Sequence, residues 1–176
     1  MGVSGAGKTT VAEQLAQRFK CAFADGDEFH SASNIAKMRA GTPLTDDDRR
    51  SWLQAIAARV HEWRAGGVGG IVACSALKRA YRRIIIGAGA GIDGQDVTLV
   101  YLRGDPALIR RRLNERQHHF MPVSLLDSQF ATLEEPGAEE HPIVLDAAKS
   151  APELVAEVWR RLHGDVAKDR PHSPLN

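Results

Sequence analysis

Gly2-Val3-Ser4-Gly5-Ala6-Gly7-Lys8-Thr9 matches the pattern G-x-x-x-x-G-K-[ST] at every fixed position. A helical pattern with Val11, Leu15 and Phe19 on one face follows directly, which is the context that the pattern requires. The glycines let consecutive backbone N–H groups turn inward around an anion. Lys8 would reach the β- and γ-phosphates, the Thr9 hydroxyl would bind Mg²⁺, and Thr10 could support the same phosphate groups. The stretch therefore predicts a nucleoside triphosphate site.

The position of this loop in the chain is unusual, because only Met1 precedes it. A phosphate-binding loop of this type normally follows a buried central strand. We therefore expect the first strand of the sheet to be missing from this chain and the true start to lie upstream. The alternative is a shortened product whose sheet lacks its middle strand.

The composition is that of one soluble globular domain. The 176 residues include 23 basic and 22 acidic side chains, a balance that argues against a general nucleic-acid or membrane-surface binder. Cys21 and Cys74 lack metal-ligand spacing and are too few for a disulfide framework, so we expect two buried thiols and a cytoplasmic location. No stretch has the length of a membrane span or the pattern of a signal peptide.

Strand and helix patterns alternate along the chain. Strands are predicted near residues 21–24, 70–74, 97–102 and 143–145, and helical patterns lie between and after them. Thr45 and Asp48 form a capping-box pattern at the start of a long helix. The alternation predicts an α/β fold, with helices on both faces of a parallel sheet in the P-loop kinase architecture. We expect one domain over 1–163, a lid at about 117–124, and a flexible tail over 164–176.

Two carboxylates follow the first predicted strand. Asp25 and Asp27 are two residues apart, a spacing that puts both side chains on one face of a strand. Phosphoryl transfer to a hydroxyl requires one carboxylate near the metal and another that orients or deprotonates the acceptor oxygen. The alternative is a simple turn, because Asp-Gly is a frequent turn dipeptide.

Several basic residues could bind anionic groups. Arg49 could hold a substrate carboxylate, or pair with a neighbouring aspartate on the surface. Lys78 and Arg82 are four residues apart and could neutralise charge at the transferred phosphoryl group, or be solvated cations. Arg112 and Arg116 precede the predicted lid and could move onto the triphosphate with it. The adjacent pair His118 and His119 is weak evidence for a metal site.

Several segments together resemble the gluconokinases that share the shikimate-kinase-like fold. The resemblance extends from Gly2 to about Leu162. It rests on Asp25-Gly26-Asp27-Glu28-Phe29-His30, Gly41-Thr42-Pro43-Leu44-Thr45-Asp46-Asp47-Asp48-Arg49, Ala73-Cys74-Ser75-Ala76-Leu77-Lys78-Arg79, and His119-Phe120-Met121-Pro122 with Ser128-Gln129-Phe130. One departure is His118, which stands where the family pattern usually has glycine.

The resemblance implies ATP-dependent phosphorylation of D-gluconate at its terminal hydroxyl, giving 6-phospho-D-gluconate, by a cytoplasmic homodimer that uses Mg²⁺. It implies that residues 2–10 hold ATP, that Thr9 and Asp25 assist the metal, and that Asp27 acts on the sugar-acid hydroxyl. It further implies that Arg49 binds the carboxylate, that Lys78, Arg82 and His30 line the acceptor pocket, and that Arg112 and Arg116 act from the lid side.

Two other readings stay open at this point. A shikimate or adenylylsulfate kinase would share the phosphate loop, but not the DGDEFH and PLTDDDR segments together. A nucleotide-binding protein without turnover is the alternative if the loss of the leading strand has inactivated the domain. A GTPase switch is disfavoured, because the chain lacks an N-K-x-D segment that would read guanine.

Overall fold

A computed structural model describes residues 1–87, 96–115 and 124–164. Arg116, residues 117–123 of the predicted lid with His118 and His119, and the tail beyond Gly164 lie outside these residues. The described elements are α1 (Lys8–Phe19), β1 (Ala22–Asp25), η1 (Gly26–Phe29), α2 (Ala32–Arg39), α3 (Asp46–Ala65), β2 (Gly70–Ala73), α4 (Arg79–Ile86), β3 (Val100–Arg103), α5 (Pro106–Glu115), α6 (Ser124–Thr132), η2 (Ala138–Glu140), β4 (Ile143–Asp146) and α7 (Ala151–His163).

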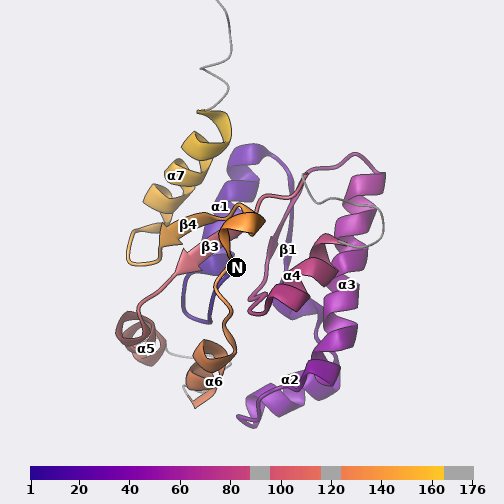
Figure 1. Ribbon diagram of the computed structural model, residues 1–176, viewed down its shortest axis with the longest axis vertical. Coiled ribbons are helices and arrows are strands. Elements are labelled where there is room, and N and C mark those ends of the chain that lie inside the picture. The colour runs from indigo at the N-terminus through magenta and orange to yellow at the C-terminus, as the bar shows by residue number, and fades with distance from the viewer. Residues whose placement is uncertain (88–95, 116–123, 165–176) are drawn as a thin grey trace, which may run out of the picture.

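The strands form two parallel pairs. β1 pairs with β2, with Asp25 opposite Ala73, and β3 pairs with β4, with Val100 opposite Ile143. The N-terminus lies between the two pairs (Figure 1). There Met1 accepts a hydrogen bond from the Leu102 N–H through its carbonyl, at 3.0 Å, while the Gly2 N–H donates to the Ser75 carbonyl at 3.2 Å. Residues 1 and 2 thus occupy the position between β2 and β3, and no strand is assigned within residues 1–7.

Helices cover both faces of the strands, as the alternating pattern predicts. On one face α1 and α7 contact each other, and Val11, Leu15 and Val158 pack with Leu102 and Leu145 in one core. On the other face α3 and α4 contact each other, and a second core around Trp52 and Ile56 packs on the β2 side. Figure 1 shows α3 and α4 together beside the β1 half of the molecule. The three-layer α/β arrangement expected from the sequence is therefore confirmed.

Local signals explain where the elements begin and end. The Thr45 side chain accepts from the Asp48 N–H and the Asp48 side chain accepts from the Thr45 N–H, so the predicted capping box starts α3. The third predicted strand is shorter than expected, because β3 begins at Val100 instead of residue 97. Within the described ranges, no helix is both long enough and apolar enough to cross a bilayer.

Candidate active site

The loop before α1 has the conformation that its glycines permit. Gly7 precedes the helix at φ +91°, in the left-handed region, and among the described residues no side chain caps the first turn. The backbone N–H groups of this turn are thus left to an incoming anion, with the positive end of the helix behind them. Lys8 lies at the helix start, and its Nζ donates to the Val3 carbonyl at 3.1 Å across the loop. This is a cradle for a phosphate chain.

The loop is held close to β3 at its beginning. Gly2 has φ +142°, and a Cβ added there would lie 2.7 Å from the Leu102 carbonyl oxygen. Any side chain at this position would push the loop away from β3, so the first glycine of the motif is required for the close approach of two backbones.

A hydroxyl and a carboxylate meet beside the cradle. The Thr9 Oγ1 donates to Asp25 Oδ2 at 2.9 Å, and the other Asp25 oxygen accepts from the Asp27 N–H at 3.0 Å. Both groups are hard oxygen donors of the kind that Mg²⁺ prefers, and Mg²⁺ commonly uses one or two carboxylates together with phosphate oxygens. Thr9 and Asp25 therefore fit the magnesium role expected of them. Groups of three or more His, Cys, Asp or Glu side chains able to hold a metal without a nucleotide are absent from the described residues.

Asp25 and Asp27 lie together for a different reason than strand alternation. Asp25 is the last residue of β1, while Asp27 belongs to the 3₁₀ turn η1, so the argument from one face of a strand is wrong. Instead, the Asp25 carboxylate caps η1 by accepting from the Asp27 N–H. The turn that the Asp-Gly dipeptide suggested as the alternative is therefore present, and it places Asp27 at the exposed carboxyl end of β1.

His30 lies at the end of this turn against α3. Its ring stacks on Trp52 with centroids 4.5 Å apart, and the Trp52 indole N–H donates to the Gly26 carbonyl at 2.6 Å, which fixes η1 on the helix. Burial lowers the pKa of His30, with Asp27 opposing the shift and Arg49 adding to it, so these three side chains share one electrostatic neighbourhood. The His30 Nδ1 atom is buried and makes no hydrogen bond within the described part of the chain. A polar ligand could supply that missing partner.

Arg49 and Lys78 converge on the same acidic side chain. Lys78 Nζ donates to both Asp46 oxygens, at 3.0 and 2.8 Å, while Arg49 Nη1 lies 3.6 Å from Asp46 Oδ1. The Tyr81 hydroxyl donates to the same carboxylate, and Arg49 Nη1 lies 3.4 Å from this hydroxyl. The hydrogen bond to Asp46 raises the pKa of Lys78, and those from Lys78 and Tyr81 lower the pKa of Asp46. The group of Asp46, Arg49, Lys78 and Tyr81 is called the cationic cluster below.

No site role was predicted from the sequence for two members of the cationic cluster, Asp46 and Tyr81. Asp46 belongs to an acidic run that suits the dipole at the start of α3, and Tyr81 follows Lys78 in a basic helix. Their pairing joins positions more than thirty residues apart, with Lys78 and Asp46 separated by 32. Only the packing of α4 against α3 brings them together.

Arg82 lies apart from the cationic cluster, in the interior. Its guanidinium forms two hydrogen bonds with the Glu140 carboxylate, at 2.6 and 2.7 Å, and Nη1 donates to the carbonyls of Ala76, Leu77 and Glu134. The Arg82 side chain is 1% exposed. Lys78 precedes α4 instead of lying on its face, so the four-residue spacing does not bring the two side chains together. The geometry argues for a structural role of Arg82 in place of the expected substrate contact.

Two side-chain contacts stand out in the other half of the molecule, and the second of them reaches the phosphate loop. Arg112 Nη1 in α5 donates to the Ala147 carbonyl at 2.7 Å, which holds the turn after β4. Gln129 Oε1 in α6 accepts from the Ser4 N–H at 2.7 Å, so α6 contacts the phosphate loop directly. Sequence reasoning placed Gln129 in a helical pattern and assigned it no site role.

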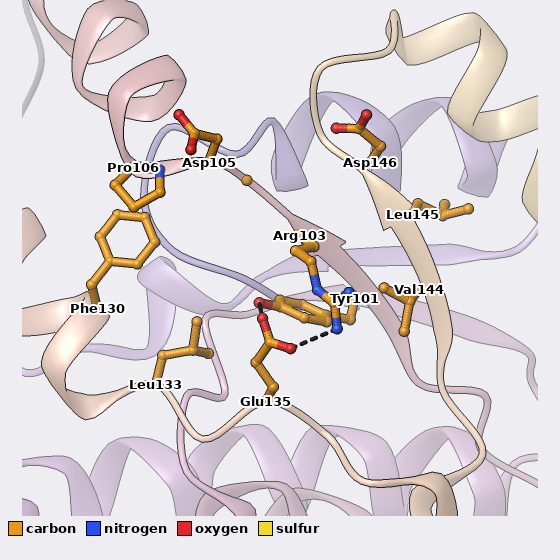
Figure 2. A pocket seen from close by; sticks show the side chains of 11 residues that line it. Tyr101, Arg103, Asp105, Pro106, Phe130, Leu133, Glu135, Val144, Leu145 and Asp146 are labelled. Atoms are coloured by element: carbon orange, nitrogen blue, oxygen red, sulfur yellow. Dashed lines mark hydrogen bonds and ion pairs between the residues drawn. The ribbon is translucent and has the colours of Figure 1, made fainter.

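A hollow on the β3–β4 side contains none of the predicted site residues (Figure 2). At its edge Glu135 accepts from the Tyr101 hydroxyl at 3.0 Å and from Arg103 Nη2 at 2.6 Å. The neighbouring Glu134 Oε2 accepts from the Arg79 N–H at 2.8 Å, at the start of α4. The segment after α6 thus ties β3 to the residue that follows Lys78.

Comparisons with known proteins agree with this geometry. A family model described as an AAA domain matches residues 1–136. The chain is 40% identical to the thermoresistant gluconokinase of Escherichia coli (strain K12) over 167 residues, covering 95% of this chain and 87% of that protein. The chain belongs to the gluconokinase family. A crystal structure of a gluconokinase from Sinorhizobium meliloti 1021 superposes with a TM-score of 0.79 at 39% identity, covering 97% of this chain and 95% of that one.

A second solved structure supports the same family fold. The unliganded crystal structure of a sugar kinase from Janibacter sp. HTCC2649 has a TM-score of 0.84 and 42% identity, covering 92% of this chain and 91% of that one. This gluconokinase-family chain therefore has the P-loop kinase fold over nearly its whole described length.

Proposed function

We propose that the protein catalyses ATP-dependent phosphorylation of D-gluconate at its terminal hydroxyl, giving 6-phospho-D-gluconate. The observation that carries this proposal is the arrangement around η1. The Thr9–Asp25 pair stands at the phosphate cradle, Asp27 follows at hydrogen-bonding distance from Asp25, and His30 and Arg49 share the surroundings of Asp27. One turn thus joins the nucleotide side of the site to a cationic acceptor side. Membership of the gluconokinase family supports gluconate over other acceptors.

On the nucleotide side, the backbone of residues 2–8 holds the phosphates and the Lys8 ammonium neutralises the charge that grows on them. Thr10 supports the same end. Thr9 and Asp25 would hold Mg²⁺, which would supply positive charge that stabilises the transferred phosphoryl group. Arg112 would contact the phosphates from α5, and Arg116 from a lid at about 117–124.

On the acceptor side, Asp27 orients the hydroxyl and takes its proton as the oxygen bonds to phosphorus and the bond to ADP breaks. Arg49 and Lys78 bind the gluconate carboxylate, replacing part of their interaction with Asp46. His30, whose Nδ1 has no partner among the described residues, receives a hydrogen bond from, or donates one to, a gluconate hydroxyl. Arg82 keeps this pocket in shape from the interior without contacting gluconate.

We also propose a cytoplasmic homodimer, from the family resemblance, and one kinase domain over 1–163 with a flexible tail over 164–176, from the sequence pattern. The protein is expected to bind neither nucleic acid nor membranes, because its basic and acidic residues nearly balance.

The test is a panel of aldonic acids offered with Mg-ATP, with products identified by mass spectrometry. Gluconate should give a monophosphate. Asp27→Asn should lower kcat by about 10²-fold or more while ATP still binds, since general-base groups contribute on that order. Asp47→Asn is the matched control, because Asp47 is an exposed aspartate paired only to Arg50 among the described residues. Absence of gluconate phosphorylation by folded protein would refute the proposed function, and an unchanged kcat in Asp27→Asn would refute the role of Asp27.

A further inference from the structure

Gln129 reaches the phosphate loop from a helix that is anchored in the core. Leu125 and Leu126 of α6 are buried, and Gln129 follows them at helical spacing on the same side of the helix. Leu126 packs in the same core as Val3 and Ala6 of the loop. The half-buried Gln129 side chain is therefore held beside the loop by the buried face of α6.

The side-chain amide of Gln129 contacts two polar groups of Ser4. Its Oε1 accepts from the Ser4 N–H at 2.7 Å, and its Nε2 donates to Ser4 Oγ at 3.3 Å. The orientation of this amide follows from chemistry, because a backbone N–H can only donate and must face the oxygen. Gln129 and Ser4 are 125 positions apart in the chain, so the contact depends on the tertiary fold.

The peptide group held by Gln129 also holds the ammonium of Lys8. The Ser4 N–H and the Val3 carbonyl belong to one planar peptide group. On the carbonyl side, Val3 accepts from Lys8 Nζ at 3.1 Å and from the Ala6 N–H at 3.3 Å. A chain of hydrogen bonds thus runs from Gln129 through one peptide group to the Lys8 ammonium, and each bond in such a chain polarises the next.

Local sterics alone leave this peptide group poorly constrained. Gly2 precedes Val3 and Gly5 follows Ser4, and both glycines have positive φ, at +142° and +83°. A segment between two glycines has many backbone conformations open to it. The hydrogen bonds of Gln129 therefore supply an orientation that the loop sequence does not impose by itself.

We propose that Gln129 is a positioning residue for Lys8. By fixing the peptide group between Val3 and Ser4, it fixes the point from which the Lys8 ammonium reaches the β- and γ-phosphates of ATP. Gln129 acts through the loop and needs no contact with the reacting atoms. Its effect on turnover rests on the proposed kinase reaction, whereas its effect on ATP binding does not.

Steady-state kinetics test the effect on turnover. Gln129→Met removes both hydrogen bonds and keeps the length of the side chain. It should lower kcat by about tenfold, because a misplacement of ~1 Å or less already has effects of this order, while the KM for gluconate changes less than about twofold. Asp127→Asn is the matched control, because Asp127 lies on the same helix in an exposed ion pair with Arg110.

The conservative variant Gln129→Glu separates the proposed role from a general loss of structure. Its carboxylate can still accept from the Ser4 N–H, and the Ser4 hydroxyl can donate to it. Most of the kcat lost in Gln129→Met should therefore return. The added negative charge near the triphosphate should raise the KM for ATP instead.

Calorimetric titration with Mg-ATP, without gluconate, tests the link to Lys8. In the parent chain, Gln129→Met should weaken ATP binding by about fivefold. In a Lys8→Met background the same change should alter the affinity less than about twofold, because no ammonium is left to position. Melting temperatures show that each variant used in the comparison is folded.

Three results would overturn the proposal. The first is an equal loss of ATP affinity in the two backgrounds, because Gln129 would then act independently of Lys8. The second is an unchanged kcat in folded Gln129→Met, and the third is a Gln129→Glu protein with no more kcat than Gln129→Met. If the parent chain binds ATP but does not phosphorylate gluconate, and the difference between the backgrounds persists, the proposed function fails while the role of Gln129 stands.

Discussion

Glu140→Gln tests whether Arg82 acts in the interior or on the substrate. The substitution keeps the shape of the Glu140 side chain and removes its charge, while the two hydrogen bonds at 2.6 and 2.7 Å lose their ionic character. Arg82 is 1% exposed, so its charge is left without a counter-charge in the interior. Removing one partner of such a pair costs ~3–5 kcal/mol. Because the carbonyls of Ala76, Leu77 and Glu134 still accept from Arg82, we expect about 3 kcal/mol, the lower end of that range.

The assay is urea unfolding followed by tryptophan fluorescence and circular dichroism, with the melting temperature as a second measurement. A loss of this size should lower the melting temperature by roughly 6–12 °C in a domain of this length. Glu139→Gln is the matched control, because the neighbouring Glu139 pairs with Arg79 at 3.1 Å with both side chains more than half exposed. Such a surface pair contributes at most about 1 kcal/mol.

Substrate kinetics complete the test. If Arg82 is structural, the folded Glu140→Gln protein should keep a KM for gluconate close to that of the parent chain. A raised KM with unchanged stability would place Arg82 in the substrate pocket and refute the reasoning. The double variant Arg82→Met, Glu140→Met should be less destabilised than the sum of the single variants, since it leaves no unpaired charge inside.

Two further predictions address the cationic cluster and the N-terminus. Lys78→Ala should raise the KM for gluconate about tenfold or more with little change in the KM for ATP, because it removes a charged hydrogen bond worth ~1.5–3 kcal/mol. Arg50→Ala is the control, because Arg50 belongs to an exposed ion pair. Equal effects of Lys78→Ala on both KM values would contradict the assignment of Lys78 to gluconate. The Met1 amine has a pKa lowered from 8.0 to about 5 in the folded chain. The unfolded chain therefore binds one more proton between these values, and the free energy of unfolding should rise by up to about 4 kcal/mol as pH increases from 5 to 8. Acetylation of Met1 should remove that pH dependence, and an unchanged slope after acetylation would assign it to another group.

The sequence predicted local structure well where one short segment decides it. The capping box of Thr45 and Asp48, the proline that starts α5 and the glycine loop before α1 are all present, because each depends on neighbouring backbone groups. The contact between Asp25 and Thr9 was also predictable. The phosphate loop and the carboxyl end of β1 lie at the same edge of a parallel sheet, and the topology brings them together.

The burial of individual charges was not predictable in the same way. Lys78 and Arg82 are both basic residues near one helix, but one contacts an exposed aspartate on α3 and the other a mostly buried glutamate more than fifty residues later. Which charge is buried depends on η2 and the segment after α6, whose position follows from long-range packing. The pairing of Lys78 with Asp46 also depends on long-range packing. Nothing in the sequence indicates it, because an acidic residue at the start of a helix is already explained by the helix dipole.

The phosphate loop is one of the connections between the two halves of the active site. Asp25, Asp27 and Lys78 lie at the β1–β2 half, whereas Arg112 and Gln129 lie at the β3–β4 half. No ladder joins β2 to β3 in the described structure, so the halves are linked around the loop by the bond from Gly2 to Ser75 and the bonds of Met1 with β3. Phosphoryl transfer is sensitive to displacements of about 1 Å between donor and acceptor groups. It follows that the contacts between the halves, from Gly2 to Ser75 and from Met1 to β3, help to set the distance between nucleotide and acceptor as well as the stability of the fold.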